Sequence, residues 1–130
     1  MGGIKGKTIA IWGLAFKANT DDIRESSALT IIEYLTGKGM KVRAFDPKAC
    51  KRAREYFKEN PLVEIVDGEY EALDGADALG VVTEWNQFRN PDFIRIKNSL
   101  KYPVIFDGRN LYNPRLLKDM GFEYFGIGRR

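Results

Sequence analysis

The chain has 130 residues, of which 44% are hydrophobic and 30% are charged, and its formal net charge is +3 at pH 7. This composition excludes a disordered chain, and the apolar runs are too short for a transmembrane helix. One cysteine and no histidine exclude an intramolecular disulfide, a Cys/His zinc site and a Ser-His or Cys-His nucleophile pair within the chain. We therefore expect a soluble protein of the reducing cytoplasm, with no metal site and no catalytic residue of its own.

Short apolar strands alternate with helical patterns, which is typical of crossover βα units and a parallel sheet. Strands are expected at residues 8–12, 41–45, 63–66, 78–83, 103–106 and 123–127. Helices are expected from about residue 28 to 37, from Asp46-Pro47 to about 58, at 69–73, from Asn90-Pro91 to about 100, and from about 114 to 120. The pattern predicts one α/β domain over residues 1–130, a Rossmann-like, doubly wound and mostly parallel sheet with helices on both faces.

The first residues lead almost directly into a strand, so no signal peptide is expected. Residues 1–3 are expected to come from cloning or from a cut inside a longer chain. Bases and acids are interspersed at residues 51–55, which favours a solvated helix face over a nucleic-acid-binding patch. We expect neither nucleic acid nor a membrane as a partner.

Ligands of open parallel sheets bind beyond the carboxyl ends of the strands, which selects the loops 13–27, 46–47, 83–90 and 107–110. The first of these reads GLAFKANTDDIRESS. A dinucleotide fingerprint needs G-x-G-x-x-G, but here the later glycines are absent and the helix starts about ten residues later than in that motif. Independent NAD binding by this turn is therefore disfavoured.

The charged residues of this loop have two interpretations each. Lys17 can place an ammonium group on a phosphate and Arg24 can offer a planar fork, but the residues alone leave these roles and a structural role equally open. For Asp21 and Asp22 we favour acids at a helix start, where they interact with the helix dipole, with Ser26 or Ser27 as the cap.

The later loops carry further candidates. Gly108 permits a sharp turn that projects Arg109 over the sheet edge, where it suits a phosphate or another anion; a structural pair with Asp107 or Asp46 is the alternative. Asp46 resembles the acid that binds a ribose in dinucleotide folds, but it precedes a proline, so a helix-capping role is favoured.

Two more residues have a structural interpretation beside a functional one. Trp85 can pack on a base or sugar, although an aromatic residue here more often belongs to a core or a domain interface. Cys50 lies inside a helix, so we expect a buried, inert thiol. The loops together indicate an anionic, nucleotide-like ligand, and no reaction follows from them.

Several ordered motifs resemble the C-terminal domain of the nucleotide-sugar 6-dehydrogenases, the family of UDP-glucose and GDP-mannose dehydrogenases. They are GLAFKANTDDIRESS at 13–27, FDP at 45–47, VTEW at 82–85, FDGRN at 106–110, GFEY at 121–124 and IG at 127–128. The TEW and FDGRN stretches look most like the UDP-glucose branch. Ala18 departs from the pattern, since many relatives carry Pro there.

The resemblance implies a domain organisation and an activity. Such enzymes have an N-terminal NAD-binding domain, a central dimerisation region and a C-terminal nucleotide-sugar-binding domain. They oxidise the sugar C6 alcohol to a carboxylate by two NAD-dependent hydride transfers, through a thioester on a cysteine of the preceding polypeptide. The resemblance thus implies an isolated UDP-binding domain of a homo-oligomeric UDP-glucose 6-dehydrogenase, inactive by itself, whose partners are a UDP-sugar and the other domains of its own polypeptide.

The resemblance also implies residue roles. Phe16 and Lys17 would contact the UDP-sugar, Lys17 near its phosphates; Arg109 would contact the substrate; and Arg24 would reach across the interdomain cleft toward NAD. The alternatives are the same domain of a dehydrogenase for UDP-N-acetylmannosamine or GDP-mannose, and a stand-alone, non-enzymatic nucleotide-binding module.

Overall fold

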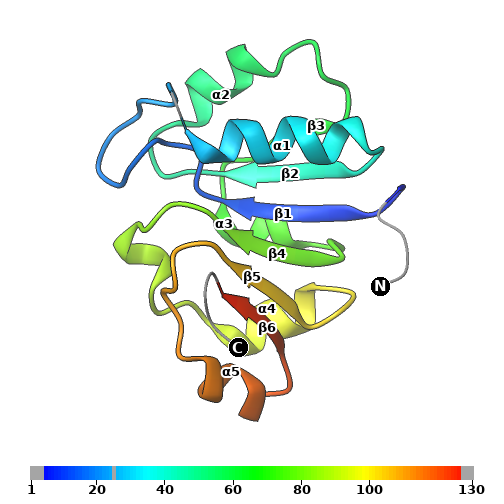
Figure 1. Cartoon of the computed structure of the whole chain (residues 1–130), viewed down its shortest axis with the longest axis vertical. Coiled ribbons are helices and arrows are strands. Elements are labelled where there is room, and N and C mark those ends of the chain that lie inside the picture. The colour runs from blue at the N-terminus through cyan, green and yellow to red at the C-terminus, as the bar shows by residue number, and fades with distance from the viewer. Residues whose placement is uncertain (1–4, 25, 127–130) are drawn as a thin grey trace.

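The computed structural model describes residues 5–24 and 26–126, and its six strands form one sheet in the order β3-β2-β1-β4-β5-β6 (Figure 1). All neighbouring strands pair in parallel. The strands are β1 (Thr8–Trp12), β2 (Lys41–Phe45), β3 (Val63–Ile65), β4 (Ala78–Val81), β5 (Val104–Asp107) and β6 (Glu123–Gly126). This confirms the predicted Rossmann-like class. The predictions for residues 1–3 and for Ile127 and Gly128 lie outside the described residues.

The helices are α1 (Ser27–Gly37), α2 (Cys50–Tyr56), α3 (Glu69–Leu73), α4 (Phe93–Ser99) and α5 (Pro114–Asp119), with a 3₁₀ turn at Asn86–Phe88. Two helix starts differ from the sequence prediction. α2 begins at Cys50 instead of Asp46-Pro47, because turns occupy residues 47–49. α4 begins after Asp92, whose side chain accepts a hydrogen bond from the Arg95 amide and so acts as the N-cap.

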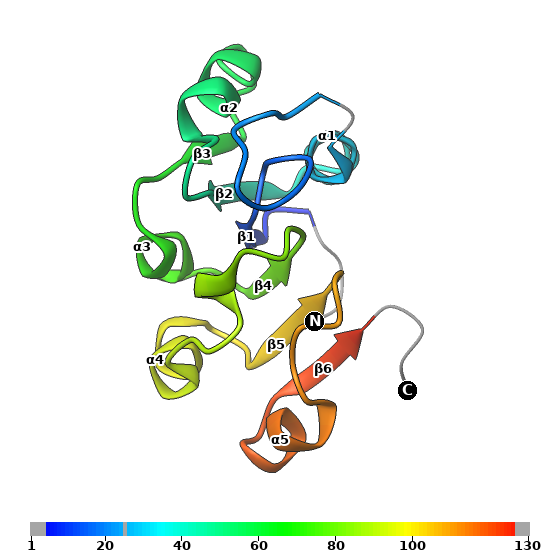
Figure 2. The same ribbon diagram turned by 90° about the vertical axis from the view of Figure 1, so that its left-hand side faces the viewer.

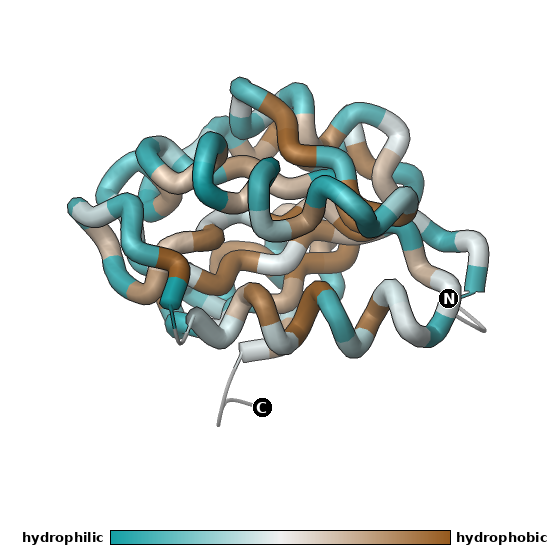
Figure 3. Tube along the Cα trace, turned by 90° about the horizontal axis from the view of Figure 1, so that it is seen from above, coloured by the Kyte–Doolittle hydropathy of each residue, from teal (hydrophilic) through white to brown (hydrophobic). Residues whose placement is uncertain are grey.

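Helices cover both faces of the sheet, with α1 on one side and α3 and α4 on the other (Figure 2). β1 shows the period of two that this arrangement needs. Its Ala10 and Trp12 belong to the core that contains residues of α3, α4 and α5, whereas Ile9 and Ile11 belong to the core with α1 and α2. Hydrophobic residues accordingly gather in the interior of the chain trace, and hydrophilic residues lie mostly at its periphery (Figure 3).

The strand order places a topological switch between β1 and β4. The chain leaves β1 toward β2 and β3, and then crosses to β4 on the other side of β1. The loops that follow β1 and β4 thus flank the crevice at which this class of sheet binds ligands. None of the helices in residues 5–24 and 26–126 is long and apolar enough to cross a membrane.

Candidate functional site

The loops after β1, β2 and β4 meet at one buried carboxylate, that of Asp46, which is 1% exposed. Its Oδ2 accepts hydrogen bonds from the backbone amides of Leu14 at 2.8 Å and Ala15 at 3.0 Å, and from Trp85 Nε1 at 3.1 Å. The start of the loop after β1 is therefore held by a residue 31 or 32 positions away in the chain.

The second oxygen of Asp46 organises the turn before α2. Oδ1 accepts hydrogen bonds from the amides of Lys48 and Ala49, both at 2.8 Å. The helix-capping role favoured from the sequence was therefore wrong, because the N-cap of α2 is Ala49, without a side-chain hydrogen bond, and the amides that Asp46 binds belong to the turn before the helix.

Gly13 allows the loops after β1 and β4 to touch. Its φ is +105°, and a Cβ added there would lie 2.5 Å from both the backbone nitrogen and the Cβ of Thr83. The Thr83 hydroxyl is buried and donates to the carbonyl oxygen of Ala15 at 2.9 Å. The glycine thus allows the two loops to pack together. The sequence pointed to the loop that begins at Thr83 but did not predict the contact of Thr83 with Ala15, because no local pattern indicates a contact 68 residues away.

Phe16 and Lys17 follow this anchored backbone directly and face outward. Phe16 is 48% exposed, and its amide donates to the carbonyl oxygen of Asp22 at 2.6 Å. Lys17 is exposed, and no residue in the described part of the chain forms an ion pair with it. An ammonium group is consequently presented at the carboxyl edge of the sheet.

Asp21 and Asp22 do not act as helix-start acids, so that prediction was wrong. The first turn of α1 contains no acidic residue, because the helix begins six and five positions later, at Ser27. Asp21 pairs with Arg52 at 2.9 Å, and Asp22 pairs with Arg24. The side-chain hydrogen bond from Arg24 lowers the pKa of Asp22 to about 2.

Ser26 is the N-cap of α1, which confirms one of the two residues that the sequence offered for this role. Its hydroxyl oxygen accepts a hydrogen bond from the Ala28 amide at 3.2 Å. Residues 13–24 therefore form a loop that displays charged side chains, rather than an early helix.

Arg109 stands on a loop that another buried acid shapes. The carboxylate of Asp107 accepts hydrogen bonds from the amides of Arg109 at 3.1 Å and Tyr112 at 2.9 Å. The left-handed residue of this loop is Asn110, with a φ of +56°, whereas Gly108 permits close contact with β4, since a Cβ there would lie 3.0 Å from the Val81 carbonyl oxygen.

The Arg109 side chain is exposed and lines an apolar groove of about 300 Å³ between α1 and the sheet. Asp107 contacts the backbone of Arg109, and among residues 5–24 and 26–126 no acid forms an ion pair with its guanidinium. The structural pair with Asp107 or Asp46 is therefore not formed.

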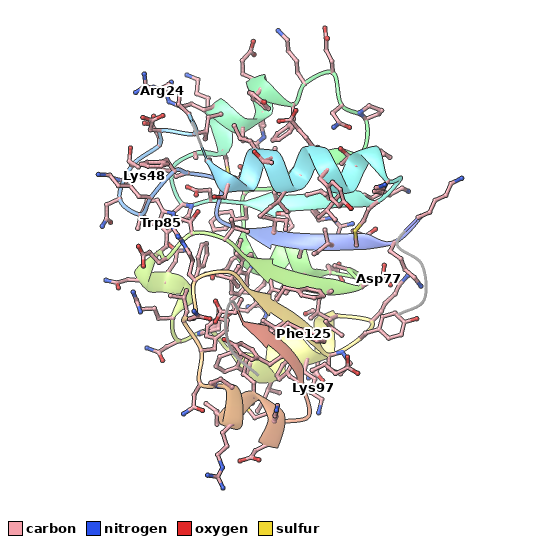
Figure 4. The ribbon with its side chains drawn as sticks, viewed as in Figure 1. Arg24, Lys48, Asp77, Trp85, Lys97 and Phe125 are labelled. Carbon is pink, nitrogen blue, oxygen red and sulfur yellow. The ribbon has the colours of Figure 1, made fainter. Side chains whose placement is uncertain are left out.

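The candidate residues share one edge of the sheet but no closed pocket. Arg24, Lys48 and Trp85 lie at this edge, while Asp77 lies at the opposite one (Figure 4). Arg24 lines a hollow of about 430 Å³ together with residues 20–22 and Arg52. Neither this hollow nor the groove at Arg109 is lined by Phe16 or Lys17. The edge is an open surface that carries separate cationic groups.

Two candidates have structural roles. Trp85 is 6% exposed and belongs to the hydrophobic core, so its indole ring is not available to stack on a base. Cys50 is half-buried, and the one proton of its thiol can be donated to the carbonyl oxygen of Asp46 at 3.2 Å or to that of Val66 at 3.3 Å. Burial raises the pKa of this thiol. In the part of the chain that the structure describes, no group of three or more His, Cys, Asp or Glu residues is arranged to hold a metal ion.

The comparisons with known proteins point to one family. Residues 10–114 match the model of the UDP-glucose/GDP-mannose dehydrogenase family, UDP binding domain. A UDP-glucose 6-dehydrogenase of Pseudomonas aeruginosa is 47% identical over 128 residues, which are 96% of this chain and 28% of that protein. A UDP-glucose 6-dehydrogenase of Rhizobium meliloti is 42% identical over 128 residues, which are 98% of this chain and 29% of that protein. The chain thus spans less than a third of the curated relatives that it matches.

Solved structures show the same similarity. A UDP-glucose dehydrogenase from Pyrobaculum islandicum superposes with a TM-score of 0.79 at 29% identity, over 99% of this chain and 27% of that one. A UDP-D-ManNAc dehydrogenase from Pyrococcus horikoshii gives a TM-score of 0.78 at 31% identity, over 97% of this chain and 26% of that one.

Proposed function

Because the chain belongs to the UDP-glucose/GDP-mannose dehydrogenase family and corresponds to its UDP-binding domain, we propose that it is the C-terminal part of a UDP-glucose 6-dehydrogenase. The complete enzyme is a cytoplasmic homo-oligomer that oxidises UDP-glucose to UDP-glucuronate by two NAD-dependent hydride transfers. Residues 1–130 form the domain that holds the nucleotide part of the substrate and do not catalyse the reaction alone.

The observation that carries this proposal is the pair of exposed cations at the carboxyl edge. Lys17 and Arg109 stand on loops whose backbones are fixed by buried groups, while their side chains remain exposed. An ammonium group and a guanidinium are the side chains that bind phosphate oxygens most strongly. Lys17 is proposed to contact the diphosphate, with Phe16 against the UDP-sugar and Arg109 against the substrate as well.

The cofactor is proposed to bind mainly to another part of the enzyme. The turn after β1 lacks the glycines that bring a backbone close to a pyrophosphate. Arg24 lies on the outer surface of the same loop, with its side chain 87% exposed, and is proposed to reach the cofactor across the cleft between domains. The thioester cysteine also belongs elsewhere, because Cys50 is half-buried inside α2 and its raised pKa disfavours the thiolate.

The test uses the 130-residue chain and the complete enzyme side by side. Calorimetry of the chain with UDP and with GDP should show a preference for UDP, and Lys17→Ala should weaken the UDP signal. The complete enzyme should release two NADH for each UDP-glucose. Steady NADH formation by the 130-residue chain alone would contradict its proposed role as a binding domain.

A second candidate substrate is UDP-N-acetylmannosamine, because a dehydrogenase of that class is among the similar solved structures. The values of kcat/KM for the two sugars decide between them. A higher value for UDP-N-acetylmannosamine would replace the substrate in the proposal and leave the nucleotide-binding role intact.

A further inference from the structure

Asp46 occupies the place where dinucleotide-binding folds carry an acid on the ribose hydroxyls, at the end of the second strand of the sheet. A carboxylate offers about four lone-pair positions. Here both oxygens are buried and five donors from the protein already address them, three on Oδ2 and two on Oδ1. No acceptor capacity remains for a ribose.

The donors on Oδ2 show what this carboxylate does instead. Leu14 and Ala15 are the last two residues before Phe16 and Lys17. Their amides are held by Asp46, and the carbonyl oxygen of Ala15 is held from the other side by the Thr83 hydroxyl at 2.9 Å. The backbone that leads into Phe16 and Lys17 is thus fixed both at its amide donors and at the carbonyl oxygen of Ala15.

We infer that Asp46 is a positioning residue, which presets the turn carrying Phe16 and Lys17 for the UDP-sugar and does not itself bind a nucleotide. The inference rests on the proposed function. A turn that is ordered before the ligand arrives loses less entropy on binding, so the contribution of Asp46 is measured as substrate affinity. Trp85 extends the same network to the loop after β4 through its indole N–H.

The experiment compares Asp46→Asn with Asp77→Asn in the complete enzyme. Asn at position 46 replaces one acceptor oxygen by an amide group that faces N–H donors. Asp77 is a matched control, because its carboxylate is also buried and accepts a backbone amide, that of Thr8 at 2.7 Å, but at the opposite edge of the sheet (Figure 4). Both variants are expected to lose thermal stability, because each alters a buried carboxylate that accepts backbone amides, so stability alone does not separate them.

For Asp46→Asn we expect the KM for UDP-glucose to rise about tenfold or more, since a misplaced Lys17 loses a charge-assisted contact. The kcat should change much less, because this contact lies away from the reacting carbon, and the KM for NAD should stay within about twofold. Asp77→Asn should leave both KM values unchanged. A raised KM for NAD with an unchanged KM for UDP-glucose would overturn the inference in favour of a ribose ligand.

A second pair of variants covers the case in which Asp46→Asn does not fold. Thr83→Val removes the hydroxyl that holds Ala15, and Thr83→Ser restores it. Positioning requires a raised KM for UDP-glucose in the first variant and a near-normal KM in the second. If Thr83→Val and Thr83→Ser have the same KM for UDP-glucose, the inference is overturned. A wild-type enzyme that fails to oxidise any nucleotide sugar would instead refute the proposed function itself.

Discussion

Arg24 and Asp22 form a bidentate ion pair, in which Nε lies 3.0 Å from Oδ1 and Nη2 lies 2.9 Å from Oδ2. The Arg24 amide also donates to Oδ1 at 2.9 Å, so the carboxylate is bound by the side chain and the backbone of the same residue. The pair stands at the surface of the loop after β1. The ion pair therefore orients the Arg24 guanidinium, which is proposed to contact the cofactor, before any ligand is bound.

This pair predicts a pH dependence. The side-chain hydrogen bond from Arg24 lowers the pKa of Asp22 from its ordinary value of 3.8 to about 2. The ionised pair thus stabilises the loop fully above pH 3.8, and this contribution is lost as the pH falls through about 2. Arg24→Ala should raise the pKa of Asp22 toward 3.8, as measured by NMR titration of its carboxyl carbon. Arg52→Ala is the comparison: Arg52 forms its ion pair with Asp21 and only its charge acts on Asp22, so this variant should raise the pKa of Asp22 less. An unchanged pKa of Asp22 in Arg24→Ala would contradict this assignment.

Lys17→Ala and Arg109→Ala should weaken substrate binding without unfolding the domain. Each removes a charge-assisted contact worth about 1.5–3 kcal/mol, which corresponds to roughly 10- to 150-fold in affinity. Both side chains are exposed, so the melting temperature should stay near that of the wild type. The measurements are the KM for UDP-glucose and thermal unfolding, with exposed Lys51→Ala on α2 as the control. Unchanged KM values in both variants would refute the assigned contacts.

Gly13→Ala should destabilise the domain. At a φ of +105° the backbone conformation alone costs an alanine about 1–3 kcal/mol, and its Cβ would stand 2.5 Å from the backbone nitrogen of Thr83. Gly75→Ala is a matched control for conformation without a clash, because Gly75 has a φ of +74° and open space around it. Urea unfolding should show a larger loss of unfolding free energy for position 13 than for position 75. Equal losses would mean that the loop after β4 moves away at no cost.

The single thiol should react slowly. Burial raises the pKa of Cys50, which disfavours the thiolate at neutral pH, and its Sγ lies within hydrogen-bonding distance of two backbone carbonyl oxygens. Modification by a disulfide reagent should be far slower in the native chain than in urea and should accelerate as the pH rises. Cys50→Ala should keep the UDP affinity of the wild type. Rapid modification at pH 7 would contradict this description of the thiol.

Local patterns were sufficient for the elements of the sheet. Buried strands such as Ala78–Val81 are short apolar runs, and a helix face such as Ala28, Leu29 and Ile32 repeats with the helical period. Both patterns can be recognised from residues that are close together in the sequence. The same patterns located the carboxyl edge, because every parallel strand ends there. Lys17, Arg24 and Arg109 were candidates because of this edge, their cationic side chains and the family resemblance, and the structure finds them on that edge with exposed side chains.

What the loops do at that edge was decided by contacts between residues remote in the chain. Asp46 bonds to an indole 39 positions away, and Thr83 bonds to a carbonyl oxygen 68 positions away. Asp21 and Asp22 looked like helix-start acids until the arginines beside them in space were known. The sequence by itself determined the strands, helices and charged loops, because hydrophobic period and turn residues are local. Only the tertiary structure decided which carboxylates face inward to order the loops and which cations remain exposed at the carboxyl edge.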